Sequence, residues 1–468
     1  MTRTTPPPQA DVIHSSGFNP QVMRQFLTYI RPHTLIFIIA LLLQLFQSVV
    51  LAYGPYLVKV AMDDGIAAGS VEVLRNTVLV YIFLNVARWG SLYLRIYLMS
   101  GVGQTIIYEL REEIFEHLQR LSLNFFSRYS VGRIITRAIN DVNVIREFVT
   151  WTLLAIFRSI FTITAIVVTM LSVDVKLSLI SFSVLPFMIL GTVIFRKYVR
   201  AGYRKVRSAI SWVNSVLAEN INGVRVVQSF TREETNYNFF HEVVNRYNLD
   251  ANTEVIRIVS IFFPLVDLLS SIAMGLVIWL GGTAVLGLQI TPGVLVAFVL
   301  YINRFFDPIR DLSQRYDSFE RAMTSGERIL GLLAETVEVQ DQPDAKEMPT
   351  IEGEVDFEHV GYHYPDGDEL VLNDINLHVQ PGELVALVGH TGAGKTTMIK
   401  LLARFIDPTD GHILIDGKDV CQVTQHSLRR QMGVVLQEPF LFSSSVRDNI
   451  RFGRLDASDE EVEAAARA

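Results

Sequence analysis

Cysteine and charge are both scarce in this sequence. A single cysteine, Cys421, occurs among 468 residues, which excludes an internal disulfide and a metal site built from several cysteines. Charged residues make up 19% of the chain, whereas apolar residues make up 50%. The apolar residues are also clustered in long runs, which is unusual in a soluble protein of this length. These features favour a protein that resides in a lipid bilayer.

The N-terminus lacks the pattern of a cleaved secretory signal. Residues 1–18 are polar, contain Pro6-Pro7-Pro8, and have no basic start followed by an apolar stretch. We expect a disordered cytosolic tail, so that membrane insertion begins with the first span.

Six apolar runs predict transmembrane helices. The first has no charged residue and is long enough to cross about 30 Å of hydrocarbon at about 1.5 Å per residue. Asp174 and Lys176 separate the third run from the fourth. Between the fifth and the sixth, Gly281-Gly282, Gly287 and Pro292-Gly293 predict a helix break and a tight turn. Core helices of a soluble bundle are a poor alternative, because several runs exceed about 18 residues. The predicted spans are 34–58, 76–99, 148–173, 177–195, 258–280 and 292–306.

The distribution of lysine and arginine predicts the orientation of these spans. The segment between spans two and three holds six arginines, and residues 196–257 hold ten basic residues. The opposite loops hold Lys59 and Arg75 against Asp63, Asp64 and Glu72, or almost no charge. Basic loops stay in the cytosol, so we expect a multi-pass protein with both termini cytosolic. A bacterial plasma membrane is the expected location, although the loop charges do not identify the membrane.

The two basic segments are too long to be turns and are rich in helix-forming residues. Each is predicted to form two helices that run out and back over about 30 to 40 Å. The expected tips are 124–132 and 219–227, where Asn, Ser and Gly interrupt the helical pattern.

Two further segments have helical amphipathic spacing. Val22, Phe26 and Ile30 predict a short helix lying along the membrane interface. After the last span, apolar residues recur at 3- and 4-residue steps, which predicts a helix leading away from the membrane. These residues are Leu312, Tyr316, Phe319, Met323, Leu330 and Leu333.

One motif carries recognisable chemistry. Residues 389–397 match the P-loop pattern G-x-x-x-x-G-K-[ST], with a predicted strand before them (383–388) and a predicted helix after them (397–405). Glycines allow backbone N–H groups to surround phosphate oxygens, and the helix N-terminus adds partial positive charge. Lys395 is expected to reach the β- and γ-phosphates and Thr396 to bind Mg²⁺. The nucleotide-binding residues predicted here are Gly389, His390, Thr391, Gly392, Ala393, Gly394, Lys395, Thr396 and Thr397.

Further motifs occur in a fixed order around the P-loop. Tyr364-Pro365 precedes it, and Ile413–Gly417 and Val434–Glu438 follow it. With six preceding spans, this order resembles a half-transporter of the ABC exporter type, in the multidrug and lipid exporter branch. The basic segments agree, since they resemble the two coupling regions of that family. The matching residues are Asn124-Phe125-Phe126, Gly132-Arg133, Asn140-Asp141-Val142, Glu219–Gly223 and Val227–Phe230.

The resemblance implies roles for two residues outside the P-loop. Tyr364 would stack on the adenine of ATP, with Tyr362 as the nearby competitor. Gln437 would contact Mg²⁺ and the attacking water. Asp416 follows an apolar run, as a Walker B aspartate does. Gly417 comes next instead of the glutamate, however, so Asp416-Gly417 is interpreted as a hairpin turn.

The resemblance also implies the domain organisation. We expect an α-helical membrane bundle of six long helices followed by an incomplete α/β P-loop domain. The predicted boundaries are a tail at 1–18, a transmembrane domain at 19–334, a linker at 335–350, and the N-terminal part of the ATP-binding cassette at 351–468. The signature motif, a Walker B Asp-Glu pair and a later His are not in the sequence, which predicts a truncated exporter half that binds nucleotide without hydrolysing it.

Four charged residues lie at or near membrane depth: Arg88, Arg95, Arg158 and Asp267. Each unpaired arginine there costs about 2.5 to 3.5 kcal/mol, so each is expected to face the bundle or a wet cavity. For Arg88 the sequence does not distinguish a substrate path from a structural role. For the others an ion pair or snorkelling is favoured.

The full-length protein is therefore predicted to export an amphipathic drug, lipid or peptide, as a homo- or heterodimer with a second half-transporter, using ATP and Mg²⁺ and binding no nucleic acid. A nucleotide-gated channel or regulatory membrane protein of the same architecture stays open as an alternative. A membrane-tethered P-loop kinase is a poorer alternative, because it leaves the long cytosolic segments unexplained.

Overall fold

The computed structural model describes residues 19–364, 370–435, 437 and 439–468. The chain forms two units. The first, which we call the helical unit, comprises Met1–His117 and Gly132–Ala334, and the second, the mixed unit, comprises Leu118–Val131 and Glu335–Ala468. The expected tail 1–18, Pro365, Leu436 and Glu438 lie outside the described residues.

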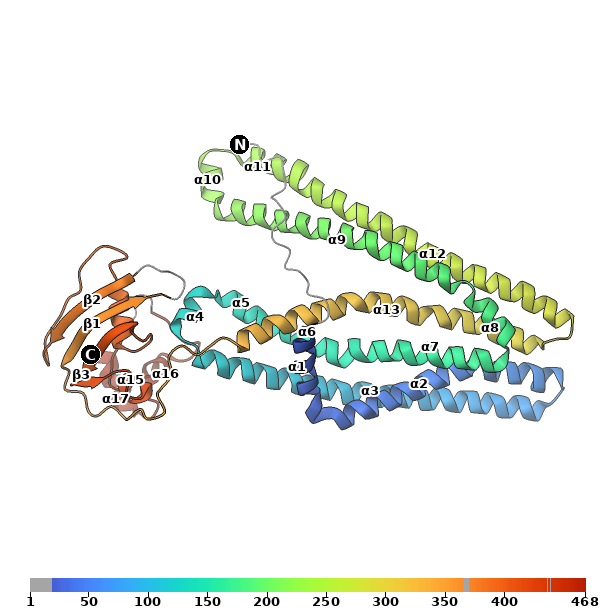
Figure 1. The fold of residues 1–468 in the computed structure, drawn as a ribbon, viewed down its shortest axis with the longest axis horizontal. Coiled ribbons are helices and arrows are strands. Elements are labelled where there is room, and N and C mark those ends of the chain that lie inside the picture. The colour runs from blue at the N-terminus through green and yellow to red at the C-terminus, as the bar shows by residue number, and fades with distance from the viewer. Residues whose placement is uncertain (1–18, 365–369, 436, 438) are drawn as a thin grey trace. The chain divides into compact units, whose positions relative to one another are not determined.

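The helical unit consists of long helices joined by short turns (Figure 1). Its helices are α1 (Pro20–Ile30), α2 (Thr34–Val60), α3 (Val71–Arg120), α5 (Val131–Thr136), α6 (Val142–Glu147), α7 (Leu153–Val173), α8 (Val175–Phe182), α9 (Leu185–Asn222), α10 (Val224–Ser229), α11 (Glu233–Phe239), α12 (Arg246–Leu286) and α13 (Pro292–Leu333).

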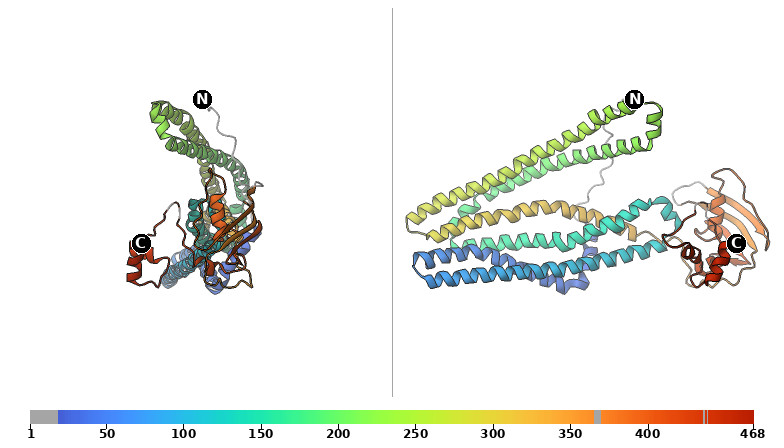
Figure 2. Two further views of the ribbon diagram at one scale, coloured as in Figure 1. Left: turned by 90° about the vertical axis from the view of Figure 1, so that its left-hand side faces the viewer. Right: turned by 180° about the vertical axis from the view of Figure 1, so that it is seen from behind.

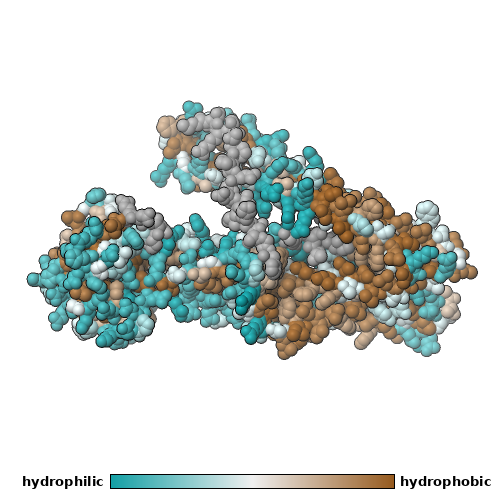
Figure 3. Space-filling view, viewed as in Figure 1, coloured by the Kyte–Doolittle hydropathy of each residue, from teal (hydrophilic) through white to brown (hydrophobic). Residues whose placement is uncertain are grey.

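Within the described residues, five helical segments are long and apolar enough to cross a bilayer. They are Pro20–Ala67, Val71–Arg120, Val131–Val173, Val175–Asn222 and Glu233–Leu286. The predicted sixth span lies in α13, which is long but has Arg304, Asp307 and Asp311 in or beside the apolar run. In Figure 3 hydrophobic residues gather over one part of the helical unit, away from the hydrophilic α10–α11 end.

The predicted helical hairpins are present. Helix α9 has 38 residues, or about 57 Å at about 1.5 Å per residue, and lies antiparallel to α12, as Figure 1 and Figure 2 show. The short helix α10 forms the second expected tip, and α4 (Leu123–Arg128) of the mixed unit forms the first.

The predicted helix break at Gly281-Gly282 is wrong, because α12 continues to Leu286 and the turn begins at Gly287. Gly281 serves packing instead. A Cβ at Gly281 would lie 2.8 Å from Leu295 Cδ1, so the missing side chain allows α12 and α13 to approach closely. Asp174 caps α8 as a side-chain acceptor, 2.7 Å from Leu177 N, which explains the tight turn between α7 and α8.

The predicted first amphipathic helix forms as α1, and protein covers its apolar face. In α1 the side chains of Val22, Phe26 and Ile30 are buried against protein, so they are not available to lipid. Phe26 packs on Phe148 with ring centroids 5.5 Å apart, and a Cβ at Gly326 would overlap both Val22 and Phe26.

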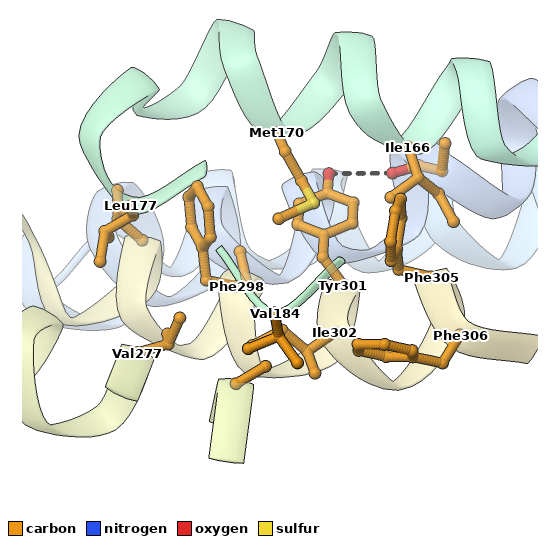
Figure 4. Packing of buried hydrophobic residues seen from close by; sticks show 14 of the residues in the cluster. Ile166, Met170, Leu177, Val184, Val277, Phe298, Tyr301, Ile302, Phe305 and Phe306 are labelled. Carbon is orange, nitrogen blue, oxygen red and sulfur yellow. Dashed lines mark hydrogen bonds between the residues drawn. The ribbon is translucent and has the colours of Figure 1, made fainter. Parts of the chain in front are cut away.

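One core of the helical unit forms where α2, α7, α8, α9, α12 and α13 meet. Phe298, Tyr301 and Ile302 of α13 are at most 1% exposed there. Met170 of α7 and Leu177 of α8 point into the same cluster (Figure 4).

A proline in α2 explains one polar contact of this core. Pro55 has no N–H, so it leaves the carbonyl of Leu51 without its helical partner. Arg304 of α13 donates to that carbonyl at 2.5 Å, and Tyr301 Oη donates to the next carbonyl, of Ala52, at 2.9 Å. Two side chains of α13 therefore stabilise the interrupted segment of α2.

Asp141 forms an ionic contact between the first basic segment and α13. It is 3% exposed and accepts two hydrogen bonds from Arg328, at 2.6 and 3.0 Å, and one from Ser325 Oγ at 2.8 Å. Replacing Asp141 with Ala leaves these donors without their acceptor.

We expect Asp141→Ala to destabilise the protein by about 1.5 to 3 kcal/mol, since hydrogen bonds to charged groups contribute about that much. Thermal unfolding in detergent measures the change. Asp250→Ala is the matched control, because Asp250 pairs with Arg246 on an exposed helical face and is expected to have little effect. Equal melting temperatures for wild type and Asp141→Ala would contradict the structural role of Asp141.

The mixed unit contains a small antiparallel sheet in the order β2-β1-β3-β4. Its elements are α4 (Leu123–Arg128), β1 (Val355–His363), β2 (Leu370–Val379), α14 (Lys395–Leu402), β3 (Asp410–Ile415), β4 (Lys418–Asp419), α15 (Gln425–Arg429), α16 (Val446–Arg451) and α17 (Asp459–Arg467). Leu401 of α14 is fully buried against Phe357 and Ile413 of the sheet. This core positions the beginning of α14.

Candidate functional site: the P-loop and a polar membrane cavity

The P-loop turns tightly before α14. Gly392 and Gly394 have φ values of 89° and 81°, a conformation that L-residues with a side chain rarely adopt. The two positions differ in their surroundings. A Cβ at Gly394 would lie 2.6 Å from Leu372 Cδ2, whereas a Cβ at Gly392 would meet nothing within 4 Å. Gly394 is therefore required both by backbone conformation and by packing on β2.

Lys395, the first residue of α14, folds back over the loop. Its ammonium group donates to the carbonyl of Gly389 at 2.8 Å and to that of His390 at 2.9 Å. Ala393 N donates to His390 O at 3.2 Å and closes the turn. The cation is thus held beside the backbone amides at a helix N-terminus, an arrangement suited to an anion.

The two threonines after Lys395 face different surroundings. Thr396 is exposed, so its hydroxyl is open to a ligand. Thr397 is only 4% exposed, and its hydroxyl lies 3.3 Å from that of Tyr364. This contact places Tyr364 beside the first turn of α14.

The structure separates the roles of the two candidate tyrosines. Tyr362 is 4% exposed and its hydroxyl accepts a hydrogen bond from Asn124 Nδ2 at 3.1 Å. Burial raises the pKa of Tyr362, and the bond from Asn124 partly offsets that effect. Tyr364 is only half-buried, with its ring perpendicular to that of Tyr362. Tyr364 is therefore the more accessible aromatic ring near the P-loop.

Glu338 connects α4 to the segment that follows α13. Glu338 accepts hydrogen bonds from Ser122 Oγ at 2.9 Å, Asn124 Nδ2 at 3.1 Å and an Arg128 guanidinium nitrogen at 2.6 Å. Glu335 also accepts a bond from Tyr129 Oη, at 3.0 Å. The acidic stretch that follows α13 therefore binds the tip of the first basic segment.

Asp416 has a structural role. It occupies the turn between β3 and β4 with Gly417, and both residues have positive φ. Its carboxylate accepts hydrogen bonds from the backbone N–H groups of Glu352, Gly353 and Glu354 at 2.7 to 3.0 Å. Desolvation raises the pKa of Asp416, but the three hydrogen bonds outweigh it and hold the pKa below its usual value. The hairpin-turn prediction for Asp416-Gly417 is confirmed.

Gln437 is exposed and lies in an irregular segment. Among the described residues, no hydrogen bond joins its side chain to Thr396 or to any other P-loop residue. The structure therefore does not bring this predicted ligand into contact with the loop.

A second polar site lies within the helical unit. Residues of α2, α3, α7 and α13 line a cavity of about 460 Å³. Four arginines and two aspartates face it, which leaves a formal charge of +2. These residues are Arg88, Arg95, Arg158, Arg304, Asp307 and Asp311.

The four charged residues predicted at membrane depth lie in different surroundings. Arg88, Arg95 and Arg158 all line the cavity. Arg158 forms an ion pair with Asp311 at 2.5 Å, which is one of the two structural roles expected for it from the sequence. Snorkelling of Arg95 is wrong, because this residue is 8% exposed inside the helical unit. Asp267 lies on an exposed face of α12 and does not line the cavity.

Comparisons with known proteins identify the family of each part of the chain. The family model described as "ABC transporter transmembrane region" matches residues 37–309, and the one described as "ABC transporter" matches residues 372–468. The chain belongs to the ABC transporter family. The resemblance to half-transporters of the exporter type is confirmed, since one membrane region precedes one ATP-binding region.

Three relatives illustrate the similarity. An uncharacterized ABC transporter ATP-binding protein of Bacillus subtilis, YknV, is 36% identical over 98% of this chain and 76% of its own length. An ATP-dependent lipid A-core flippase of Desulfotalea psychrophila is 30% identical over 96% of this chain and 78% of its own length. A multidrug efflux ATP-binding/permease protein of Mycobacterium bovis is 33% identical over 92% of this chain and 36% of its own length.

In this ABC transporter the predicted strand before the P-loop does not form. Residues 383–388 belong to no sheet within the described part of the chain, and Leu384 and Val388 are 97% and 89% exposed. Val435, in the later apolar run, is 99% exposed. A strand needs a neighbouring strand to satisfy its backbone groups, and none of the described strands lies beside these segments. The helix after the P-loop begins at Lys395 and ends at Leu402, earlier than predicted.

Some contacts of the site were not anticipated from the sequence. Nothing in the spacing indicated that Asn124 would hold Tyr362 and Glu338, which lie more than 200 residues away. The cavity, by contrast, is indicated by the spacing of two polar residues in the sequence. Gln44 and Ser48 are four residues apart in an otherwise apolar span, and both line the cavity. Helical spacing of polar residues in a span indicates a polar face.

The two P-loop glycines provide a test of the loop geometry. We expect Gly394→Ala to abolish ATP binding, because it combines a left-handed backbone, which costs a side-chain-bearing residue about 1 to 2 kcal/mol, with a clash against Leu372. Gly392→Ala carries only the backbone cost and should bind ATP more weakly than wild type but more tightly than Gly394→Ala. Titration with a fluorescent ATP analogue measures both. Equal losses in the two variants would show that packing on Leu372 is unimportant.

Proposed function

We propose that the full-length protein uses ATP to export an amphipathic molecule, as one half of a dimeric ABC exporter. The observation that carries the proposal is Lys395, held over a glycine-shaped loop at the start of α14 in a chain that also contains long apolar helices. The relatives support it by their names, since one is a lipid A-core flippase and another a multidrug efflux protein.

ATP binding follows from the geometry of the P-loop. The N–H groups of residues 389–397 would surround the phosphates, and Lys395 would exchange its two carbonyl acceptors for phosphate oxygens. Tyr364 would stack on the adenine ring, since it is more accessible than Tyr362 and lies beside α14.

Thr396 and Gln437 are the proposed Mg²⁺ ligands. Hydroxyl and amide oxygens suit this hard cation, which takes few protein ligands when phosphates supply the others. Both side chains are exposed, so both are accessible to a metal–nucleotide complex. Bound Mg²⁺ would neutralise part of the phosphate charge.

The contacts of α4 suggest how nucleotide binding is transmitted. Asn124 binds Tyr362, whose ring packs against that of Tyr364 with centroids 5.1 Å apart. A nucleotide that orders Tyr364 would therefore act on a ring in direct contact with an α4 anchor. Closure of two cassettes around ATP would then switch the spans between inward- and outward-facing states, as alternating access requires differential affinity for ATP.

The export proposal predicts accumulation of cargo against a gradient. Inverted vesicles that contain the full-length protein should accumulate an amphipathic fluorescent dye when ATP is added, and Lys395→Ala should abolish accumulation because phosphate binding is lost. Lys400→Ala is the matched control, since Lys400 lies on the same helix one turn beyond the P-loop. Dye movement that only dissipates a gradient would favour the nucleotide-gated channel instead.

We also propose that the 468-residue chain binds ATP without turning it over. No Asp-Glu pair directly follows an apolar run in this sequence, and Asp416, which resembles a Walker B aspartate, is bound by three backbone N–H groups. The purified chain should bind a fluorescent ATP analogue and release phosphate only at the background rate. Steady phosphate release that Lys395→Ala abolishes would contradict this proposal.

A further inference from the structure

Arg404 occupies a backbone position where glycine is usual. It is the second residue after α14 and has a φ of 50°, in the left-handed region. Phe405 N donates to Lys400 O at 2.8 Å, and Arg404 N donates to Leu401 O at 2.9 Å, which is the hydrogen-bond pattern of a helix that ends in a left-handed residue. Glycine adopts this conformation without strain, whereas arginine does not. The contacts of the Arg404 side chain therefore have to offset a strained backbone.

The guanidinium group of Arg404 is buried and hydrogen-bonded on several sides. The residue is 1% exposed. It donates to the carbonyl oxygens of Gln340, at 3.0 Å, and of Val423, at 2.5 Å. The carboxylates of Asp341 and Asp407 each accept a further bond, at 3.2 Å. A buried charge is costly without such partners, and two of the four belong to the segment that follows α13, so the environment of Arg404 depends on that segment.

Residues 335–341, which we call the strap, contact two parts of the mixed unit. The glutamates of the strap bind α4 and the residues beside it. Its last two residues bind Arg404, and Gln425 N supports this contact by donating to Asp341 Oδ1 at 3.0 Å. The strap therefore holds the end of α14 that lies opposite the P-loop.

Helix α14 is short enough for contacts at one end to affect the other. It has eight residues, or about 12 Å at about 1.5 Å per residue. Lys395 and Thr396 lie in its first turn, and Leu401 fixes its last turn in the core of the mixed unit. A tilt about Leu401 would displace the groups that face the phosphates, and hydrogen bonds weaken steeply when their geometry is distorted. The contacts of Arg404 therefore bear on the geometry of the phosphate site.

We propose that Arg404 is a positioning residue for the P-loop, and that docking of the strap on Arg404 raises the affinity of the mixed unit for ATP. The inference rests on the ATP binding proposed above and adds a means of regulating it. With the strap docked, α14 holds its first turn in the orientation that binds phosphate. With the strap released, Arg404 loses two of its four acceptors and α14 is free to shift. By thermodynamic linkage, ATP binding and strap docking then favour each other by the same factor.

Both directions of this linkage are measurable on the full 468-residue chain in detergent. Titration with a fluorescent ATP analogue gives the affinity. Amide hydrogen exchange of residues 335–341, with and without a saturating concentration of the same analogue, reports how often the strap opens. We expect the analogue to slow exchange of the strap in the wild type by about fivefold, at the lower end of the usual range for coupled sites. A purely structural role of Arg404 does not produce this nucleotide-dependent protection.

Three variants and a control locate the effect. Asp341→Asn removes the charge that binds Arg404 at a side chain that is 38% exposed, so the variant is expected to fold. It should bind the analogue about threefold more weakly and exchange the strap faster without nucleotide, whereas Arg404→Gln should approach the limit of about fivefold set by the linkage. Arg404→Lys keeps the charge without the planar group and should recover part of that loss. Asp344→Asn is the matched control, because Asp344 is exposed and is not a partner of Arg404, and it should bind as the wild type does.

Wild-type affinity in Asp341→Asn would overturn the inference, as would strap exchange that the analogue leaves unchanged in the wild type. These two results decide the matter even if Arg404→Gln does not fold. A wild-type chain that does not bind the analogue would refute the proposed ATP binding and this inference with it. Normal binding that is independent of the strap would refute this inference alone.

Discussion

Polar groups inside hydrocarbon have no water to bond with, and the helical unit depends on how the protein replaces that water. Pro55 removes one helical hydrogen bond from α2, and Arg304 supplies the Leu51 carbonyl with another donor. Ser48 and Thr162 satisfy each other between α2 and α7, with their hydroxyl oxygens 3.0 Å apart. The position of α13 against α2 is therefore set by specific polar contacts as well as by the apolar core around Phe298.

Much of the fold could be predicted because its signals are local. Runs of apolar residues and helical spacing determine where spans lie, and short Asn-, Ser- and Gly-containing stretches determine where α4 and α10 turn the chain. The same local reasoning failed at Gly281-Gly282, where glycine permits close packing and does not end the helix. Local spacing predicted the helix α1 but not what covers its apolar face, because only the tertiary structure shows that Gly326 leaves room for Val22 and Phe26.

The candidate site shows a similar division. The P-loop is contiguous in sequence, so its residues and the conformations of Gly392 and Gly394 follow from the motif. The strand predicted at 383–388 does not form, and its own residues could not show this, since a strand is completed by hydrogen bonds to another segment. Likewise, the sequence alone does not distinguish Tyr362 from Tyr364. The two differ because Asn124 binds the hydroxyl of Tyr362. Long-range contacts of this kind leave no trace in residue spacing.

The polar cavity is informative because it departs from the constraint that governs the rest of the helical unit. Each uncompensated arginine at membrane depth costs about 2.5 to 3.5 kcal/mol, and among the described side chains Arg95 has neither a carboxylate partner nor a hydrogen bond to its Nε. Water can reduce that cost in a cavity of about 460 Å³. A ligand that enters must then replace the hydrogen bonds of the displaced water. An apolar molecule cannot do so, so a ligand that displaces this water needs polar groups of its own.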